Sequence, residues 1–379
     1  MQIRNIIIIL CLVWGMSSCI DKYWPDIKKY ENVLVVDGLL TNGNDPVIVR
    51  LSVSSAINNG ALIPLTGGEL YITDENHEEI SLTEIEPGTY QVEDESFSGE
   101  VGSSYQLHIS LPNGQNYVSD ICSLSAPSPI DSVYGNIESF ANPNSYHDLH
   151  GIQFYIDNHS NNDTSFYLWR LTQTYKYRAS FTLDYTWEGA FIPYPNPDSL
   201  RTCWRTTEVN EIFTFTTKYL DKPVITRFPL NYVSTETKML SIRYSLLVKQ
   251  LYISKRAFDF WNALQQQNID QGNLYSQQPI QIRGNVQNVA NTEEPVLGYF
   301  TVAGVTEKRI YLNHPPLVFY HGECAPDYEG MRFLRFEPEE LWPIYITYVQ
   351  DAGMALGIKE SCFDCRLDGG SLTPPDFWE

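Results

Sequence analysis

The sequence of 379 residues lacks the short motifs by which the common enzyme classes are recognised. It contains no G-x-S-x-G nucleophile turn, no H-E-x-x-H zinc helix, no G-x-x-x-x-G-K-[ST] phosphate loop and no G-x-G-x-x-G dinucleotide turn. A glycoside hydrolase needs only two suitably spaced carboxylates, and 46 acidic residues can always supply such a pair. We therefore predict no catalytic residues and keep a hydrolase acting on glycan or peptide as the alternative.

Positive charge is scarce as well. The chain has 25 Lys and Arg residues against 46 Asp and Glu, which gives a formal net charge of -21 at pH 7. A surface this acidic repels phosphate backbones and anionic lipid headgroups at long range. We expect no nucleic-acid partner, and any attachment to a membrane must come from a lipid or from another protein.

The apolar run at the N-terminus is short. It covers Ile6–Trp14, which is nine residues, whereas a helix that spans a bilayer needs about 20. Arg4 stands ahead of it as the only charged residue of this segment. A short apolar core behind one basic residue is typical of an export signal.

The stretch Gly15-Met16-Ser17-Ser18-Cys19 follows this run and resembles a bacterial lipobox, with Met16 where leucine is most common. We expect residues 1–18 to be a cleaved signal peptide and Cys19 to carry a thioether-linked lipid. Residues 19–32 then form a tether to the first folded unit. The alternatives are an ordinary cleaved signal with an incidental cysteine, or an uncleaved anchor.

Aromatic residues are abundant, with 25 Tyr, 17 Phe and 8 Trp, and they favour the half-buried surfaces of a mostly β protein. Across residues 33–125, short strand-like runs recur with turn signals between them, which is typical of an immunoglobulin-like β-sandwich. The clearest hairpin joins Tyr105–Leu111 to Gln115–Cys122. Its Asn113-Gly114 pair predicts a type I′ turn.

A proline-rich break at Ala126-Pro127-Ser128-Pro129 separates this unit from a larger one, residues 130–379. We expect the larger unit to be an antiparallel β-sandwich with one short helix. Its longest alternating strand covers residues 241–253. Beyond residue 312 the tail shows little periodicity, so we expect disulfides to hold it.

The helix is predicted directly after that long strand. Ser254 is a good N-cap, and Gly272 can end the segment. Between them, apolar residues fall at helical spacing and should pack on the sheet. These residues are Ala257, Phe258, Trp261 and Leu264.

Tyrosine, tryptophan and proline are concentrated between Gln173 and Trp204, which predicts a long hairpin ending in an exposed aromatic loop. Exposed rings of this kind stack on sugars or grip peptides at low entropic cost. The alternative is that the rings pack on their own sheet. The candidate ligand surface consists of Tyr185, Trp187, Tyr194 and Trp204.

Five cysteines remain once Cys11 in the signal and Cys19 are set aside. Oxidation is the default outside the cytoplasm, and an odd number leaves one thiol unpaired. We assign the free thiol to the first of the five, because it lies inside an apparent strand, where a cysteine usually acts as a small buried hydrophobe. The five are Cys122, Cys203, Cys324, Cys362 and Cys365.

The closely spaced pair Cys362 and Cys365 is better placed to reach separate partners than to join each other. We therefore predict that they bridge to Cys203 and Cys324, in either of the two possible pairings. His321 and Cys324 together with the later pair would also suit a tetrahedral zinc site. An oxidising compartment favours disulfides over zinc, so we expect no metal there.

Two further patterns resemble metal sites weakly. No helix is predicted that would place His147 and His150 on one face, so we interpret them as part of a polar loop. The oxygens of Asp157, Asn161 and Asp163 fail the register of a calcium loop, and a hairpin loop fits them better. We expect no metal ion and no other cofactor.

Several motifs taken together resemble the Bacteroidota lipoprotein family catalogued as domain of unknown function 4249. They are Ser241–Gln250, the helix with Phe260-Trp261, Gly272–Tyr275, Gln278–Asn285, Val296–Phe300 and the ending Cys362–Trp378. The resemblance implies no enzymatic activity and no catalytic residues. It also implies genes beside TonB-dependent outer-membrane transporters, and therefore an accessory role in nutrient capture. Cys203, Cys362 and Cys365 match the family pattern, whereas the surroundings of Cys324 match less closely.

The sequence and the resemblance together predict a non-catalytic lipoprotein of the outer membrane. We expect it to bind a ligand or to dock on a TonB-dependent transporter, with a glycan or a peptide as the possible ligand. The lipid on Cys19 would hold it to the membrane. The face of the membrane is left open.

Overall fold

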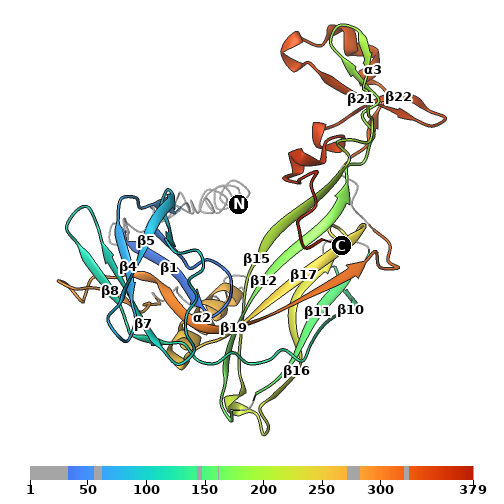
Figure 1. The fold of residues 1–379 in the computed structure, drawn as a ribbon. Coiled ribbons are helices and arrows are strands. Elements are labelled where there is room, and N and C mark those ends of the chain that lie inside the picture. Colours follow the sequence, from blue (N-terminus) through green and yellow to red (C-terminus); the bar gives the residue numbers. More distant parts are fainter. Residues whose placement is uncertain are drawn as a thin grey trace, which may run out of the picture.

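The fold is that of a computed structural model (Figure 1), which describes residues 33–54, 62–142, 147–160, 162–270, 282–319 and 324–378. The expected signal peptide, Cys19, the tether and the expected helix end at Gly272 lie outside these residues. Strands dominate the described chain, which confirms the mostly β class. No helix in this part of the chain is long and apolar enough to cross a membrane.

The N-terminal unit packs short strands around one apolar core that includes Val36, Ile72 and Leu107. The alternation predicted for its clearest hairpin is present, because Tyr105, Leu107 and Ile109 are buried while their neighbours are half-exposed. The strands are β1 Leu34–Thr41, β2 Ile48–Val53, β3 Ile63–Pro64, β4 Glu69–Thr73, β5 Glu79–Glu86, β6 Thr89–Val92, β7 Ser104–Ser110, β8 Asn116–Ser119 and β9 Cys122–Ser123.

The turn between β7 and β8 differs from the predicted type I′. Only Gly114 has a positive φ, at 84°, and its N–H donates to the carbonyl of Leu111 at 2.9 Å. The turn therefore runs from Leu111 to Gly114 and includes Pro112 at its second position. Proline fixes a negative φ, which excludes a primed turn there and leaves the left-handed conformation to the glycine that follows.

The central unit is a sandwich of two sheets, in the orders β15-β12-β17-β19 and β10-β11-β16. Large rings fill the space between them, among them Phe154, Trp169 and Tyr244, all nearly inaccessible to solvent. The strands are β10 Ser132–Phe140, β11 Leu149–His159, β12 Phe166–Arg178, β15 Thr202–Thr216, β16 Val224–Ser234, β17 Arg243–Tyr252 and β19 Leu297–Asn313.

Strand β17 shows why one alternating sequence stabilises this arrangement. Tyr244, Leu246 and Val248 lie on its inner face within the core. Gln250 continues that face, fully buried, and its Oε1 accepts hydrogen bonds from Trp169 Nε1 at 3.0 Å and from Asn158 Nδ2 at 2.7 Å. Its Nε2 donates to the carbonyl of Ser128 at 2.9 Å. A buried amide with satisfied partners thus ties the proline-rich break to the centre of the sheet.

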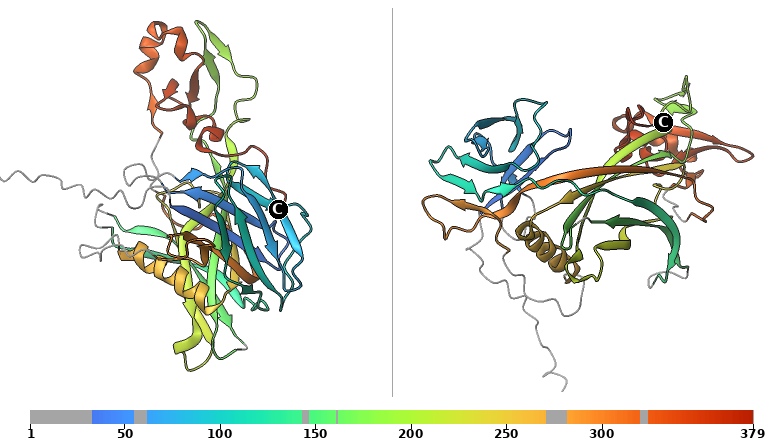
Figure 2. Two further views of the ribbon diagram at one scale, coloured as in Figure 1. Left: turned by 90° about the vertical axis from the view of Figure 1, so that its left-hand side faces the viewer. Right: turned by 60° about the horizontal axis from the view of Figure 1, so that its bottom comes forward.

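The other face of the same sheet is covered by α2 Lys255–Asp270. Ser254 caps this helix as predicted, because its Oγ accepts from the N–H of Ala257 at 3.2 Å. Ala257 and Phe260 are buried against the sheet, while Phe258 and Trp261 pack at the rim of the same cluster. The helix therefore seals the outer side of the sheet, close to the point where the two units meet (Figure 2).

Strand β19 joins the two units without a linker (Figure 2). Its first half pairs in parallel with β1 as far as Ala303, and from Gly304 onward it pairs with β17. At about 3.3 Å per residue, its 17 residues span on the order of 55 Å. One continuous strand therefore belongs to both units.

The simple division of the chain at residues 126–129 needs correction for the same reason. The chain returns to the N-terminal unit through β18 Val286–Asn288, which pairs with β8, and through the first half of β19. Val286, Val296 and Phe300 lie in its core. Residues 33–125 thus need a distant segment of the chain to complete their packing.

The C-terminal residues fold back onto β17 and β19. The guanidinium of Arg309 lies over the ring of Phe377, and that of Arg243 lies 4.6 Å from the ring centre of Tyr311 and 5.7 Å from that of Trp378. Tyr311 also donates a hydrogen bond to the carbonyl of Phe377. Cation–π contacts of this kind contribute about 0.5–2 kcal/mol each, so the last residues are held in place.

Candidate functional site

A small separate module stands beyond the ends of β12 and β15, at the top of Figure 1. We call residues 181–200 and 324–363 the distal module. Its five strands are arranged in the order β14-β13-β21-β22-β20. They are β13 Tyr185–Trp187, β14 Phe191–Pro193, β20 Pro326–Asp327, β21 Ile344–Val349 and β22 Gly353–Gly357. The tail that we expected to be irregular therefore contains strands of its own.

The module forms because the long hairpin and the tail each supply half of two small cores. Trp187 packs with Leu334 and Ile346 in one of them. Leu183 and Phe363 pack together in the other. Neither half could bury its apolar face alone, since a two-stranded hairpin is marginal in water. The expected exposed aromatic loop is thus largely covered by the tail.

Two disulfides fasten the module, and they confirm the predicted set of four cysteines. Cys203 of β15 is joined to Cys365, and Cys324 is joined to Cys362. This is one of the two pairings left open by the sequence. Cys122 is free, as predicted. Burial is the main cause that raises the pKa of its thiol, to about 11.

The residues between the two terminal cysteines have separate structural roles. Phe363 fills the second small core, and Asp364 accepts three hydrogen bonds from the Arg366 guanidinium and one from its backbone N–H. Burial acts to raise the pKa of Asp364, but these bonds from Arg366 outweigh it and hold the pKa below its usual value. The Cys-Phe-Asp-Cys motif thus links the distal module to the central sandwich.

The structure does not bring the four candidate ligand residues into one surface. Trp187 is 7% exposed and Tyr185 is half-buried, both in the first small core. Tyr194 is half-buried beside the second core. Trp204 lies on β15 with Lys176 Nζ 4.9 Å from its ring centre, and its backbone pairs with Ser371.

The most exposed apolar side chains of the module lie in its tail half. Phe336 is 83% exposed, Phe333 is 61% exposed and Leu341 is 56% exposed. They belong to three consecutive short helices, α3 Gly330–Phe333, η3 Leu334–Phe336 and η4 Glu339–Leu341. Isolated apolar residues on a surface are common, but three in one short segment mark a candidate interaction site.

A shallow groove of about 550 Å³ lies beside these side chains. Its lining comes from both halves of the module: Trp187, Gly189, Arg335, Glu337, Pro338, Glu339 and Trp342. The indole N–H groups of Trp187 and Trp342 are buried and donate to no described atom. An unsatisfied buried donor costs about 1–3 kcal/mol, so a partner carbonyl that reached either group would be stabilised there.

Comparison with known proteins identifies the family. The family model described as "Domain of unknown function (DUF4249)" matches residues 20–309, which is most of the chain. The chain belongs to the DUF4249 family. No curated protein matches this DUF4249 member. A solved structure described as "Biofilm associated protein - BSP domain" is similar at 7% identity over 75% of this chain and 59% of that one, with a TM-score of 0.15, which carries no argument about the fold.

The family match ends at Arg309, within β19, so residues 324–363 of this DUF4249 protein lie beyond it. The tail half of the distal module, with its exposed apolar residues, and both terminal cysteines are therefore outside the matched part. One wall of the groove, with Trp187 and Gly189, belongs to the residues that the family model matches. The other wall, with Arg335 and Trp342, lies beyond them.

The weak metal patterns lead to no assembled site in the described residues. No group of three or more His, Cys, Asp or Glu side chains converges there. His147 contacts Glu236 at 3.5 Å, whereas His150 is hydrogen-bonded to Ser139. Asp157 accepts from Ser132 and from the N–H of Arg227. His321 and Asn161 lie outside the described residues.

The sequence also carries a signal for the tail half of the module, which the expectation of an irregular tail missed. Residues 344–349 are all β-branched or aromatic, and a turn follows in which Asp351 and Gly353 have positive φ values of 64° and 92°. That pattern predicts a hairpin in the tail. The sequence therefore predicts a strand that could pair with β13, but it does not predict the exposure of Phe336.

Proposed function

We propose that this DUF4249 protein is a non-catalytic lipoprotein of the outer membrane that docks on a TonB-dependent transporter through its distal module, as an accessory component of nutrient uptake. The observation that carries the proposal is the exposure of Phe336 beside the groove. Burial of one such ring contributes about 1.5–3 kcal/mol, so a soluble protein that leaves it exposed gains most by covering it with a partner.

The charge of the chain favours a protein partner over the lipid surface. Exposed rings next to Arg332 and Arg335 would suit a membrane interface in a basic protein. Here the net charge is -21, and Glu337, Glu339 and Glu340 follow directly in sequence. Repulsion from anionic headgroups opposes insertion, whereas an apolar contact on a transporter meets no such penalty.

A lipid on Cys19 would favour the same assignment, because tethering raises the effective concentration of the module near an integral membrane protein. A weak contact through the groove is then enough to hold the module on the transporter. The nutrient served by the pair would be a glycan or a peptide, the ligand classes that aromatic side chains commonly hold. A hydrolase has no specific support among the described residues, where the buried carboxylate, Asp364, is held by Arg366.

The anchor is tested by Cys19→Ala. We expect the native chain to partition into the detergent phase of a Triton X-114 extraction and the variant to partition into the aqueous phase, because a diacylglycerol group supplies the apolar anchor and no helix among the described residues is long and apolar enough to replace it. The measurement is the fraction of protein in each phase by immunoblot. Equal partitioning of both forms would show that no lipid on Cys19 anchors the chain.

The docking contact is tested by Phe336→Asp, with Tyr219→Asp as the matched control. Tyr219 is 82% exposed, against 83% for Phe336, but lies in η2 Thr217–Tyr219 after β15, away from the distal module. We expect Phe336→Asp to reduce co-purification of the transporter from detergent-solubilised outer membranes at least about tenfold, because a buried ring is replaced by a charge. The Tyr219→Asp control should retain normal co-purification of the transporter.

Mass spectrometry of the co-purified band must identify a TonB-dependent transporter for the result to support the proposal. Equal recovery with both variants would show that the distal module is not the contact. Recovery of the native chain without any transporter would remove the docking function itself.

A further inference from the structure

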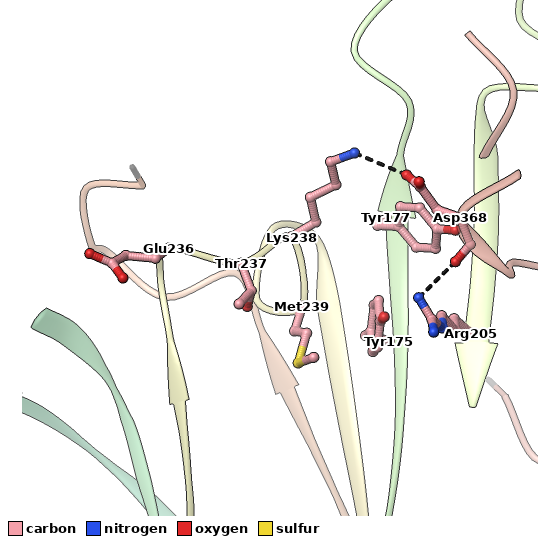
Figure 3. Close-up of a pocket in the computed structure, with 8 residues that line it drawn as sticks. All are labelled: Tyr175, Tyr177, Arg205, Glu236, Thr237, Lys238, Met239 and Asp368. Carbon is pink, nitrogen blue, oxygen red and sulfur yellow. Dashed lines mark hydrogen bonds and ion pairs between the residues drawn. The ribbon is translucent and has the colours of Figure 1, made fainter. Parts of the chain in front are cut away.

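A second pocket lies in the central sandwich, next to the short helix η6 Cys365–Asp368 that follows the distal module (Figure 3). Its volume is about 230 Å³, below the range of pockets that hold drug-sized ligands. Tyr175 and Tyr177 of β12 form one wall, and Arg205 of β15 lies next to them. Lys238 and Met239 reach in from the β16–β17 turn, and Asp368 of η6 closes the side opposite Lys238.

The walls of this pocket are fixed by covalent and hydrogen bonds. The Cys203–Cys365 disulfide holds η6 against β15. Tyr177 donates its hydroxyl hydrogen to the carbonyl of Cys365 at 2.6 Å, and Arg205 Nη1 donates to the carbonyl of Asp368 at 2.7 Å. A site held in this way costs little ordering entropy when a ligand enters.

The pocket lining has two cations, Arg205 and Lys238, and two carboxylates, Glu236 and Asp368, so its formal charge is zero. Lys238 Nζ lies 3.2 Å from Asp368 Oδ2, so these two charges offset each other. Glu236 also lines the pocket but points away from the other side chains (Figure 3), toward His147 at 3.5 Å and Asn142. Arg205 remains as a cation whose guanidinium donates to a neutral carbonyl. In a chain with a net charge of -21, a cation placed this way selects for an anion.

The rest of the lining limits the ligand to a small, partly apolar anion. The Tyr175 ring and the Met239 thioether supply apolar surface next to the Arg205 guanidinium. A planar guanidinium matches a carboxylate with two parallel hydrogen bonds. A doubly charged phosphate would bring a second negative charge close to Asp368.

We propose that this pocket binds the carboxylate of a small organic acid, with the carboxylate on Arg205 and the aliphatic part against Met239 and Tyr175. Arg205 would bind the carboxylate, Lys238 would keep the charge of Asp368 offset, and the Asp368 carboxylate would disfavour dianions. This site would act independently of docking through the distal module, which lies beyond the Cys203–Cys365 bridge.

The test compares three probes on the full chain by saturation-transfer NMR and competition: butyrate, its uncharged isostere butyramide, and inorganic phosphate. We expect butyrate to bind at least tenfold more tightly than the other two. Arg205→Gln should weaken butyrate at least tenfold, whereas Arg50→Gln, an exposed arginine paired with Asp37, should leave binding unchanged. Arg205→Lys keeps the charge but loses the two parallel hydrogen bonds of the guanidinium, so its affinity for butyrate should lie between those of the native chain and Arg205→Gln.

Folding of each variant is checked by its thermal midpoint and by mapping the Cys203–Cys365 bridge without reduction. If Arg205→Gln fails to form the bridge, Lys238→Gln takes its place and is expected to weaken butyrate severalfold. Equal binding of butyrate and butyramide, tighter binding of phosphate, or unchanged butyrate affinity in the folded Arg205 or Lys238 variant would overturn the proposal.

Discussion

Replacing Gly298 with alanine is expected to lower the free energy of unfolding by more than about 3 kcal/mol, the scale of overpacking combined with backbone strain. Gly298 has a φ of 83°, and a Cβ built there would lie 1.9 Å from the carbonyl oxygen of Val36. Both residues belong to the parallel pairing of β1 with β19. The backbone of β1 would have to move, so the junction of the two units would open.

Gly114→Ala is the matched control for Gly298→Ala. Gly114 has nearly the same φ, 84°, but nothing lies within 4 Å of its built Cβ. Its substitution should cost only about 1–2 kcal/mol, from the left-handed backbone alone. Guanidinium denaturation followed by tryptophan fluorescence measures both values. Equal losses at the two glycines would mean that the contact with Val36 does not hold the units together.

Removal of the Cys203–Cys365 bridge, by replacing both cysteines with alanine, is expected to cost about 3–5 kcal/mol of stability. The bridge joins residues 162 apart in sequence, so it restricts the unfolded chain strongly. Both cysteines are fully buried, which adds lost packing to the entropic effect. Denaturation under non-reducing conditions is the measurement.

The second bridge provides the comparison for the first. Cys324 and Cys362 are only 38 residues apart, and chain entropy predicts a loss about 1 kcal/mol smaller for their double replacement with alanine. It should loosen the distal module and leave the central sandwich intact. If removal of the Cys203–Cys365 bridge cost no more than the Cys122→Ala change at the free thiol, the tail would not depend on that bridge.

The parts of the fold that sequence reasoning predicted correctly are those with a local cause. The alternation along β17 follows from the period of a strand, and the helix after Ser254 follows from a cap and helical spacing. The set of bridged cysteines followed from oxidation and an odd count. Each of these inferences needed only residues close in sequence or a simple chemical rule.

The parts that were missed depend on pairing between distant segments. No local signal tells that β19 leaves β1 at Ala303 and joins β17 at Gly304. The covering of Trp187 depends on Leu334 and Ile346, which lie about 150 residues later in the chain. The same long-range pairing buried Trp187 of the expected aromatic loop and left Phe336, which nothing in the sequence singles out, as the most exposed phenylalanine among the described residues.

Docking through the distal module is tested most directly by photo-crosslinking in intact cells. A benzoyl-phenylalanine placed at position 336 should form an adduct with a TonB-dependent transporter on irradiation, because this side chain lies at the proposed contact. The same group at position 219, equally exposed and outside the module, should form none. An adduct from both positions, or from neither, would contradict docking through the distal module.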